Sequence, residues 1–241
     1  MIWWMIAAVC AFFVKGLCGF ANTLVFTAVM SFGVSNIAIS PVELLLGYPT
    51  NALIAWRERK SIEWRLCLPL AALVVLGSIP GMLLLKNADA GAIKALFGVL
   101  IVALGLEMLL RGRKGSGEKE SRGSRTALAV IGLLSGVLCG LFGVGALLGA
   151  YVGRTAKNSS AFRANLCFVF FVENTLRIVT YTAAGILHAG LLGQAAMLVP
   201  FMLLGLYLGF AACGRLNERV VQKAVVVMLI ISGMVLIAGN I

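Results

Sequence analysis

The chain has 241 residues, of which 61% are hydrophobic and 12% are charged; its formal net charge is +11 and its mean hydropathy is +1.03. This composition excludes a soluble globular domain, a disordered chain and a disulfide-stapled fold, because a soluble core of this size cannot bury so much apolar surface. We therefore expect an integral membrane protein in contact with the lipid bilayer over most of its length.

Apolar stretches follow one another along the whole chain, and a helix that crosses a bilayer needs about 20 apolar residues. A segment rich in glycine, serine and charge at 111–125 is typical of an exposed linker. We predict a first transmembrane repeat at 1–110 and a second at 126–241. The predicted apolar stretches are 2–34, 40–56, 66–85 and 91–110 in the first repeat, and 126–153, 163–186, 190–213 and 219–240 in the second.

Most lysines and arginines lie in or beside four connections, at 57–65, 111–125, 154–163 and 215–223. The positive-inside rule places these connections in the cytoplasm and both chain termini outside, in a cell inner membrane. The net charge of +11 then reflects membrane orientation, and we expect no nucleic-acid partner.

Two of the apolar stretches would have to enter the membrane and return on the same side. Residues 126–153 join two cytoplasmic connections, and a glycine cluster at 139–149 is suited to breaking a helix in the middle of that stretch. Residues 2–34 would likewise enter the membrane from the outside and return to the outside, with a break at 15–23. The sequence thus predicts two re-entrant or broken helical hairpins.

The two halves resemble each other in sequence. Residues 16–21 match 140–145 at an offset of 124, and residues 50–53 match 173–176 at an offset of 123. We predict an all-α fold of two inverted-topology repeats, each a hairpin plus three transmembrane helices, as in many secondary transporters. Coincidence in glycine-rich apolar sequence is the alternative.

Two cations lie deep in the predicted spans. Lys15 directly precedes the first break, and Arg177 lies 14 residues past Arg163, or about 21 Å along a helix. A charge at that depth costs at least about 2.5 kcal/mol, so it usually faces a partner or a cavity. We interpret both as a positive midplane site for an anion. The alternatives are a structural ion pair of Arg177 with Glu173, and pairing of Lys15 with Glu43 or Glu107.

Each break should also begin a half-helix whose free N–H groups and positive dipole end favour an anion. The candidate binding residues at the two tips are Gly19, Asn22 and Thr23, and Gly143 and Gly145. Asn51 and Asn174, related by the repeat, are further candidates, with interhelical hydrogen bonding as the alternative. Close helix packing is an equal alternative for the other glycines, namely Gly132, Gly136 and Gly149.

No enzyme motif is visible in the sequence. There is no Ser/His/Asp cluster, nucleotide-binding loop or pair of carboxylates, and the single histidine, His188, excludes a multi-histidine metal or haem site. The sequence therefore predicts no catalytic residue, no metal and no cofactor.

The chain resembles the sulfite exporter TauE/SafE family of membrane permeases over essentially its whole length. The residues that carry the resemblance are 132–145, 161–166, 174–177 and 181–185 in the second half, and 16–24 and 56–59 in the first. The resemblance implies transport of sulfite or organosulfonates, with Gly143, Gly145, Asn174 and Arg177 as site residues. At the first tip the sequence reads Phe20-Ala-Asn-Thr23 where the family usually has three glycines, which leaves the identity of the anion open.

We therefore predict a secondary transporter of small sulfur-containing anions. Moving one negative charge out of a negative-inside cell gains about 2.3 kcal/mol per 100 mV, which favours export. Uptake would need H⁺ or Na⁺ as a coupling ion, and Glu173 is the acid placed to carry a proton beside Arg177. The alternatives are an anion channel and a non-transporting partner subunit of a membrane complex; a homo-oligomer is compatible with each.

Overall fold

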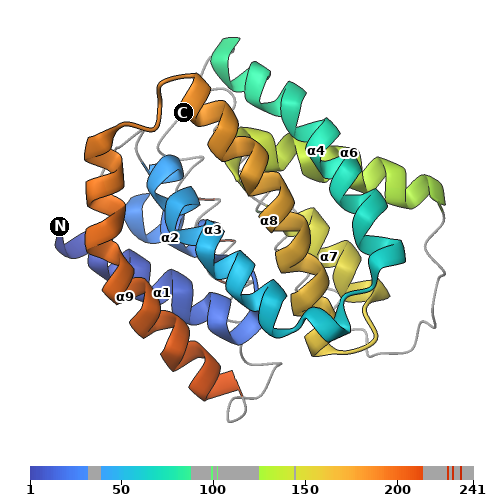
Figure 1. Cartoon of the computed structure of the whole chain (residues 1–241), viewed down its shortest axis with the longest axis horizontal. Helices are drawn as coiled ribbons and strands as arrows, with labels where there is room; N and C mark the ends of the chain where they lie inside the picture. The colour runs from blue at the N-terminus through green and yellow to red at the C-terminus, as the bar shows by residue number, and fades with distance from the viewer. Residues whose placement is uncertain are drawn as a thin grey trace. The chain divides into compact units, whose positions relative to one another are not determined.

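A computed structural model describes residues 1–31, 39–87, 125–143 and 145–213, together with positions 99, 102, 227, 230 and 234. Outside the described residues lie the predicted spans 91–110 and 219–240 and the predicted linker 111–125. The exceptions are the single positions just named and Arg125. Within the described ranges the chain is helical and contains no strand. The elements are α1 (Ile2–Cys18), α2 (Asn22–Ser31), α3 (Ile39–Arg57), η1 (Arg59–Ser61), α4 (Trp64–Asn87), α6 (Arg125–Phe142), α7 (Ala146–Thr155), α8 (Ser159–Ala183) and α9 (Ala189–Cys213) (Figure 1).

Three of the described helices are long and apolar enough to cross a membrane, and these are Trp64–Met82 in α4, Ser159–Ala183 and Ala189–Ala212. Shorter apolar helices occupy Ile2–Leu17 and Leu128–Gly140. The predicted class, an all-helical membrane protein, is confirmed for the described part of the chain.

The chain divides into two compact units, which we call the first and the second unit. Among the described elements, the first unit contains α1, α2 and α9 from Pro200 onward. The second unit contains α3, η1, most of α4, α6, α7, α8 and α9 up to Val199. Each unit therefore draws helices from both predicted repeats.

In the first unit the predicted helix break is present between α1 and α2, which pack against each other. Gly19 ends α1 in the left-handed conformation (φ +83°), and its N–H donates to the carbonyl of Lys15 at 2.6 Å. Glycine adopts this conformation without the penalty that a Cβ brings. Ala21 is also left-handed (φ +70°), the one such non-glycine residue among those described, and α2 begins directly after it.

The second unit contains a matching break between α6 and α7. Gly143 is left-handed (φ +71°), its N–H donates to the carbonyl of Cys139 at 2.7 Å, and α7 begins at Ala146 with Gly145 as its N-cap. Both half-helices thus start where the glycine pattern predicted, at Asn22 and Ala146.

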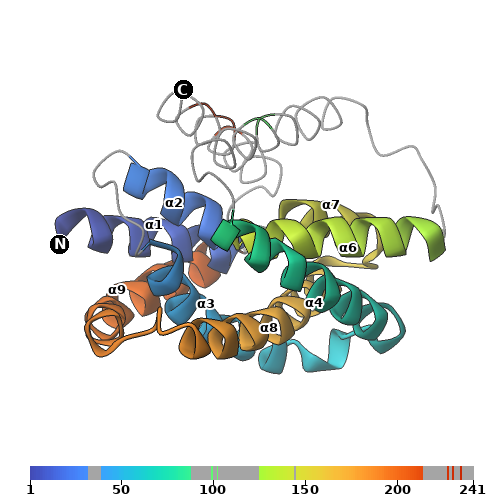
Figure 2. The ribbon, with the colours of Figure 1, turned by 90° about the horizontal axis from the view of Figure 1, so that it is seen from above.

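Helix α6 packs against α4 in the second unit (Figure 2). Glycines of both helices lie where they cross. A Cβ on Gly136 would lie 2.8 Å from the Cα of Gly77, and a Cβ on Gly81 would lie 3.2 Å from the Cα of Gly140. Because these neighbours are backbone atoms, no side chain fits at the crossing, and the packing interpretation of Gly136 is confirmed. In the first unit Gly16 packs on α9 in the same way, since its Cβ would lie 2.9 Å from the Cα of Gly209.

Helices α3 and α8 of the second unit run beside each other (Figure 1). Tyr48 stacks on Phe171 with ring centroids 5.0 Å apart. At one end of α8, the side chain of Asn158 accepts a hydrogen bond from the N–H of Ala161 at 2.8 Å and so caps the helix. The packing of α3 on α8 sets the orientation of α8, and so the direction in which its polar residues point.

Candidate functional site

One face of α8 carries an unusual set of polar residues for a helix apolar enough to span a membrane. Glu173, Asn174, Arg177 and Tyr181 recur at the spacing that places side chains on one side of a helix, and all four are buried. Glu173 and Arg177 are each only 1% exposed. Charges at such depth are costly, so their environment decides what the site can do.

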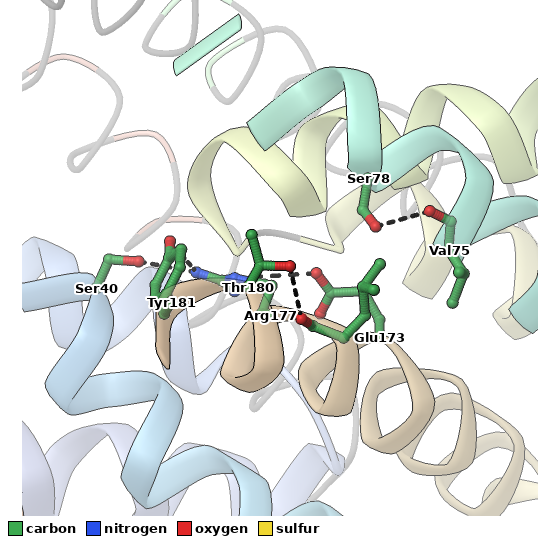
Figure 3. Close-up of polar contacts among 8 residues, drawn as sticks. Ser40, Val75, Ser78, Glu173, Arg177, Thr180 and Tyr181 are labelled. Carbon is green, nitrogen blue, oxygen red and sulfur yellow. Dashed lines mark hydrogen bonds and ion pairs between the residues drawn. The ribbon is translucent and has the colours of Figure 1, made fainter. Parts of the chain in front are cut away.

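The Arg177 guanidinium is held at one end by two hydroxyl groups (Figure 3). Its Nη2 donates to Ser40 Oγ in α3 at 2.8 Å and to the Tyr181 hydroxyl at 3.3 Å. The Tyr181 ring also lies 5.4 Å from the guanidinium carbon, within the range of a cation–π interaction. These contacts orient the group without neutralising its charge.

Glu173 lies on the other side of the guanidinium, one turn earlier on α8 (Figure 3). Its Oε1 is 3.9 Å from Arg177 Nε, and neither of these two atoms has a hydrogen-bond partner. The predicted ion pair is therefore present, but it is not closed by a hydrogen bond. Buried donors and acceptors are normally satisfied. The Arg177 Nε–H can therefore still donate to a water or an anion, and Glu173 Oε1 can still accept from a water or bind a proton.

The break between α6 and α7 lies directly against this face of α8. A Cβ on Gly143 would lie 2.5 Å from Arg177 Nη1 and 3.2 Å from its Cζ, so only glycine leaves room for the guanidinium there. Gly145 is the N-cap of α7 and makes no side-chain cap, and the positive end of the α7 dipole adds to the charge of Arg177. Arginine and a helix N-terminus at one point form an arrangement suited to an oxyanion.

The structure brings together only part of the predicted site. One cluster in the second unit contains or adjoins Gly143, Gly145, Glu173 and Arg177. Asn174 lies on the same face of α8 as Glu173 and Arg177. Asn51 in α3 is buried, and its Oδ1 has no hydrogen-bond partner.

The other predicted residues surround the first break in the first unit. Lys15 is fully buried in the last turn of α1, with its Nζ 5.7 Å from the centroid of the Phe12 ring. Gly19 forms the break, Asn22 is buried in the first turn of α2, and Thr23 is half-buried. Binding roles for these residues stay predictions.

The whole chain was also compared with known protein families. The family model described as "Sulfite exporter TauE/SafE" matches residues 4–236. This chain belongs to the TauE/SafE family. No significant match was found among curated proteins or among solved structures. Members of this family are membrane permeases and not enzymes. Membership implies a multi-pass membrane protein that transports sulfite or another sulfur-containing anion.

Sequence reasoning missed two residues of this TauE/SafE site. Tyr181 lies four residues after Arg177, so helical spacing could have identified it as a partner. Ser40 lies 137 residues away from Arg177 in the chain, and no local pattern connects the two.

Proposed function

We propose that this TauE/SafE chain is a secondary transporter that exports a small sulfur-containing anion, such as sulfite or an organosulfonate, across the inner membrane. The observation that carries the proposal is the Arg177 guanidinium, 1% exposed and set against the helix break at Gly143 with its Nε unbonded. A cation held in this way is a binding group for an anion that arrives from outside the fold.

The chemistry of the site favours an oxyanion over a halide. The planar guanidinium presents paired N–H donors that match two oxygens of a sulfite or sulfonate group, and such bidentate contacts are the stronger ones. Three oxygens on one sulfur leave a further acceptor for the N–H groups at the start of α7. Chloride offers no such geometry.

Correspondences between the two units support the proposed pair of inverted repeats. Gly19 and Gly143 are 124 residues apart. Both are left-handed, and each ends a helix with its N–H donating to the carbonyl four residues earlier. The close approach of Gly16 to Gly209 corresponds to that of Gly140 to Gly81, with shifts of 124 and 128 residues. Duplicated hairpins of this kind are typical of transporters that work by alternating access.

A second correspondence concerns α3 and α8. Tyr48 and Phe171 occupy equivalent positions at the offset of 123, and their rings stack on each other. Contact between equivalent residues is what a two-fold relation requires along its axis. We propose that α3 and α8 are the repeat-related pair on this axis, and that the basic connections at 57–65 and 154–163 both face the cytoplasm.

The direction of transport and the choice of coupling ion both depend on the charge of the transported anion. Export of a monoanion gains about 2.3 kcal/mol per 100 mV of negative-inside potential. An anion bound to Arg177 would compete with the Glu173 carboxylate 3.9 Å away, so anion binding favours protonation of Glu173. Export of the anion alone therefore needs no coupling ion, and for uptake we propose H⁺ as the coupling ion, carried by Glu173, with Na⁺ as the alternative.

We carry forward from the sequence the proposal that the first break also contributes to anion binding. Lys15 would supply a second positive charge, Gly19 and the N–H groups of α2 would supply donors, and Asn22 and Thr23 would add side-chain hydrogen bonds. The two asparagines at equivalent positions, Asn51 and Asn174, would contact the anion as it passes.

The test is anion efflux from proteoliposomes that contain the purified protein, with sulfite, sulfoacetate, taurine, sulfate and chloride as substrates. We expect saturable efflux of one sulfur anion, and its loss in both Arg177→Gln and Arg177→Lys, because lysine keeps the charge but not the planar fork. The matched control is Arg163→Gln, which removes an arginine from the same helix at its ion pair with Glu58.

The alternatives give different results in the same assay. Flux that rises linearly with concentration and shows no trans-stimulation would identify a channel. Variants of Arg177 that change thermal stability but leave efflux intact would contradict the binding role and favour a structural subunit. Export of the anion alone should be electrogenic. Anion uptake should be accompanied by proton uptake that is lost in Glu173→Gln, and unchanged proton movement in that variant would refute the coupling role of Glu173.

A further inference from the structure

Three phenylalanines lie within four residues of α8, and each has a different neighbour. The ring of Phe168 meets Trp64 edge-on, with centroids 5.1 Å apart, and Phe171 stacks on Tyr48. Phe170 alone among them lies at the break between α6 and α7. The run therefore contains one ring at the candidate site and two that pack elsewhere.

The Phe170 ring fills the space that glycine leaves at position 145. A Cβ on Gly145 would overlap Cζ and Cε1 of that ring, and the next nearest atom would be Cys139 Sγ at 3.6 Å. The ring thus lies against the N-cap residue of α7. An aromatic ring there offers neither a charge nor a strong hydrogen bond, so its contribution is to occupy volume.

Phe170 and Arg177 bracket the break from the same face of α8. They are seven residues apart, or two turns, which corresponds to about 10.5 Å along the helix axis. Arg177 lies against Gly143, and Phe170 lies against Gly145. An anion whose sulfur group binds Arg177 and whose organic part extends along α8 would meet the Phe170 ring at its far end.

We propose that Phe170 is a specificity-determining residue that limits the length of the organic part of the transported anion. The inference rests on the proposed function, since it assumes that Arg177 binds the sulfur group. Sulfite has no organic part and would not reach the ring. Sulfonates with longer chains would reach it, and the ring excludes them.

The experiment compares efflux of sulfite with efflux of straight-chain alkanesulfonates of one, two, four and six carbons. We expect Phe170→Ala to raise the ratio of long-chain sulfonate efflux to sulfite efflux by about tenfold or more, since one methylene of misfit in an apolar pocket changes discrimination by roughly 10–200-fold. Phe171→Ala is the matched control, because it removes a neighbouring ring that packs on Tyr48 and should leave the ratio unchanged.

Two further measurements keep the inference open to refutation. If Phe170→Ala fails to fold, inhibition of sulfite efflux in the unmodified protein by the same series should fall sharply beyond one chain length; equal inhibition by all lengths would overturn the proposal. An equal effect of Phe170→Ala and Phe171→Ala on the ratio would overturn it as well. Loss of sulfite efflux in Arg177→Gln separates these results from failure of the proposed function itself.

Discussion

The crossing of α4 and α6 predicts a specific cost for one added methyl group. In Gly136→Ala the new Cβ would lie 2.8 Å from the Cα of Gly77 and 3.0 Å from the backbone N of Ser78. Both neighbours are backbone atoms, so no rotamer change relieves the overlap and the two helices must move apart. Overpacking of this kind costs about 1–3 kcal/mol.

The matched control is Gly193→Ala in α9, where a Cβ would meet nothing within 4 Å. Alanine in place of a helical glycine gains up to about 1 kcal/mol of helix propensity in both variants, so their difference isolates the overpacking cost. For a chain of this size about 1 kcal/mol corresponds to roughly 2–4 °C. Thermal unfolding in detergent should therefore place Gly136→Ala about 2–12 °C below Gly193→Ala. Equal melting temperatures would show that the close crossing does not contribute to stability.

The remaining predictions concern contacts away from the candidate site, and thermal unfolding measures each of them. Asn158→Ala should cost about 1 kcal/mol, because the cap on the Ala161 N–H is lost, and Asn158→Asp should restore most of it. A double-mutant cycle on Tyr48 and Phe171 should give a coupling energy of about 0.5–1.5 kcal/mol, and a value near zero would contradict the stacking. Removing the partly exposed ion pair of Arg163 with Glu58 should cost less than about 1 kcal/mol, and less still in high salt.

The helix breaks and the buried ion pair could be predicted from sequence because each depends on local chemistry. A left-handed residue at a helix end favours glycine, so the clusters around Gly19 and Gly143 indicated both breaks. Residues four apart on a helix face each other, so Glu173 and Arg177 could be paired from their spacing alone.

The rest of the site depends on distant parts of the chain. Ser40 reaches Arg177 only because α3 packs beside α8, and no sequence pattern indicates that contact. The same glycine residue type also serves two purposes, since Gly136 permits a helix crossing while Gly143 forms a break. Within the run Phe168–Phe171, sequence gave no means of knowing which ring lies at the break.

The close packing of α1 on α9 has a consequence for how the protein is made. Gly16 lies against Leu206 and Gly209, which are synthesised about 190 residues later. At 5–20 residues per second a ribosome needs about 10–40 s to reach them. During that interval Gly16 lacks the helix on which it packs, whereas α4 has already been made when α6 is synthesised. A chain truncated before Gly209 would lack part of the helix surface on which Gly16 packs, so the packing of the first helix depends on residues that are made late in synthesis.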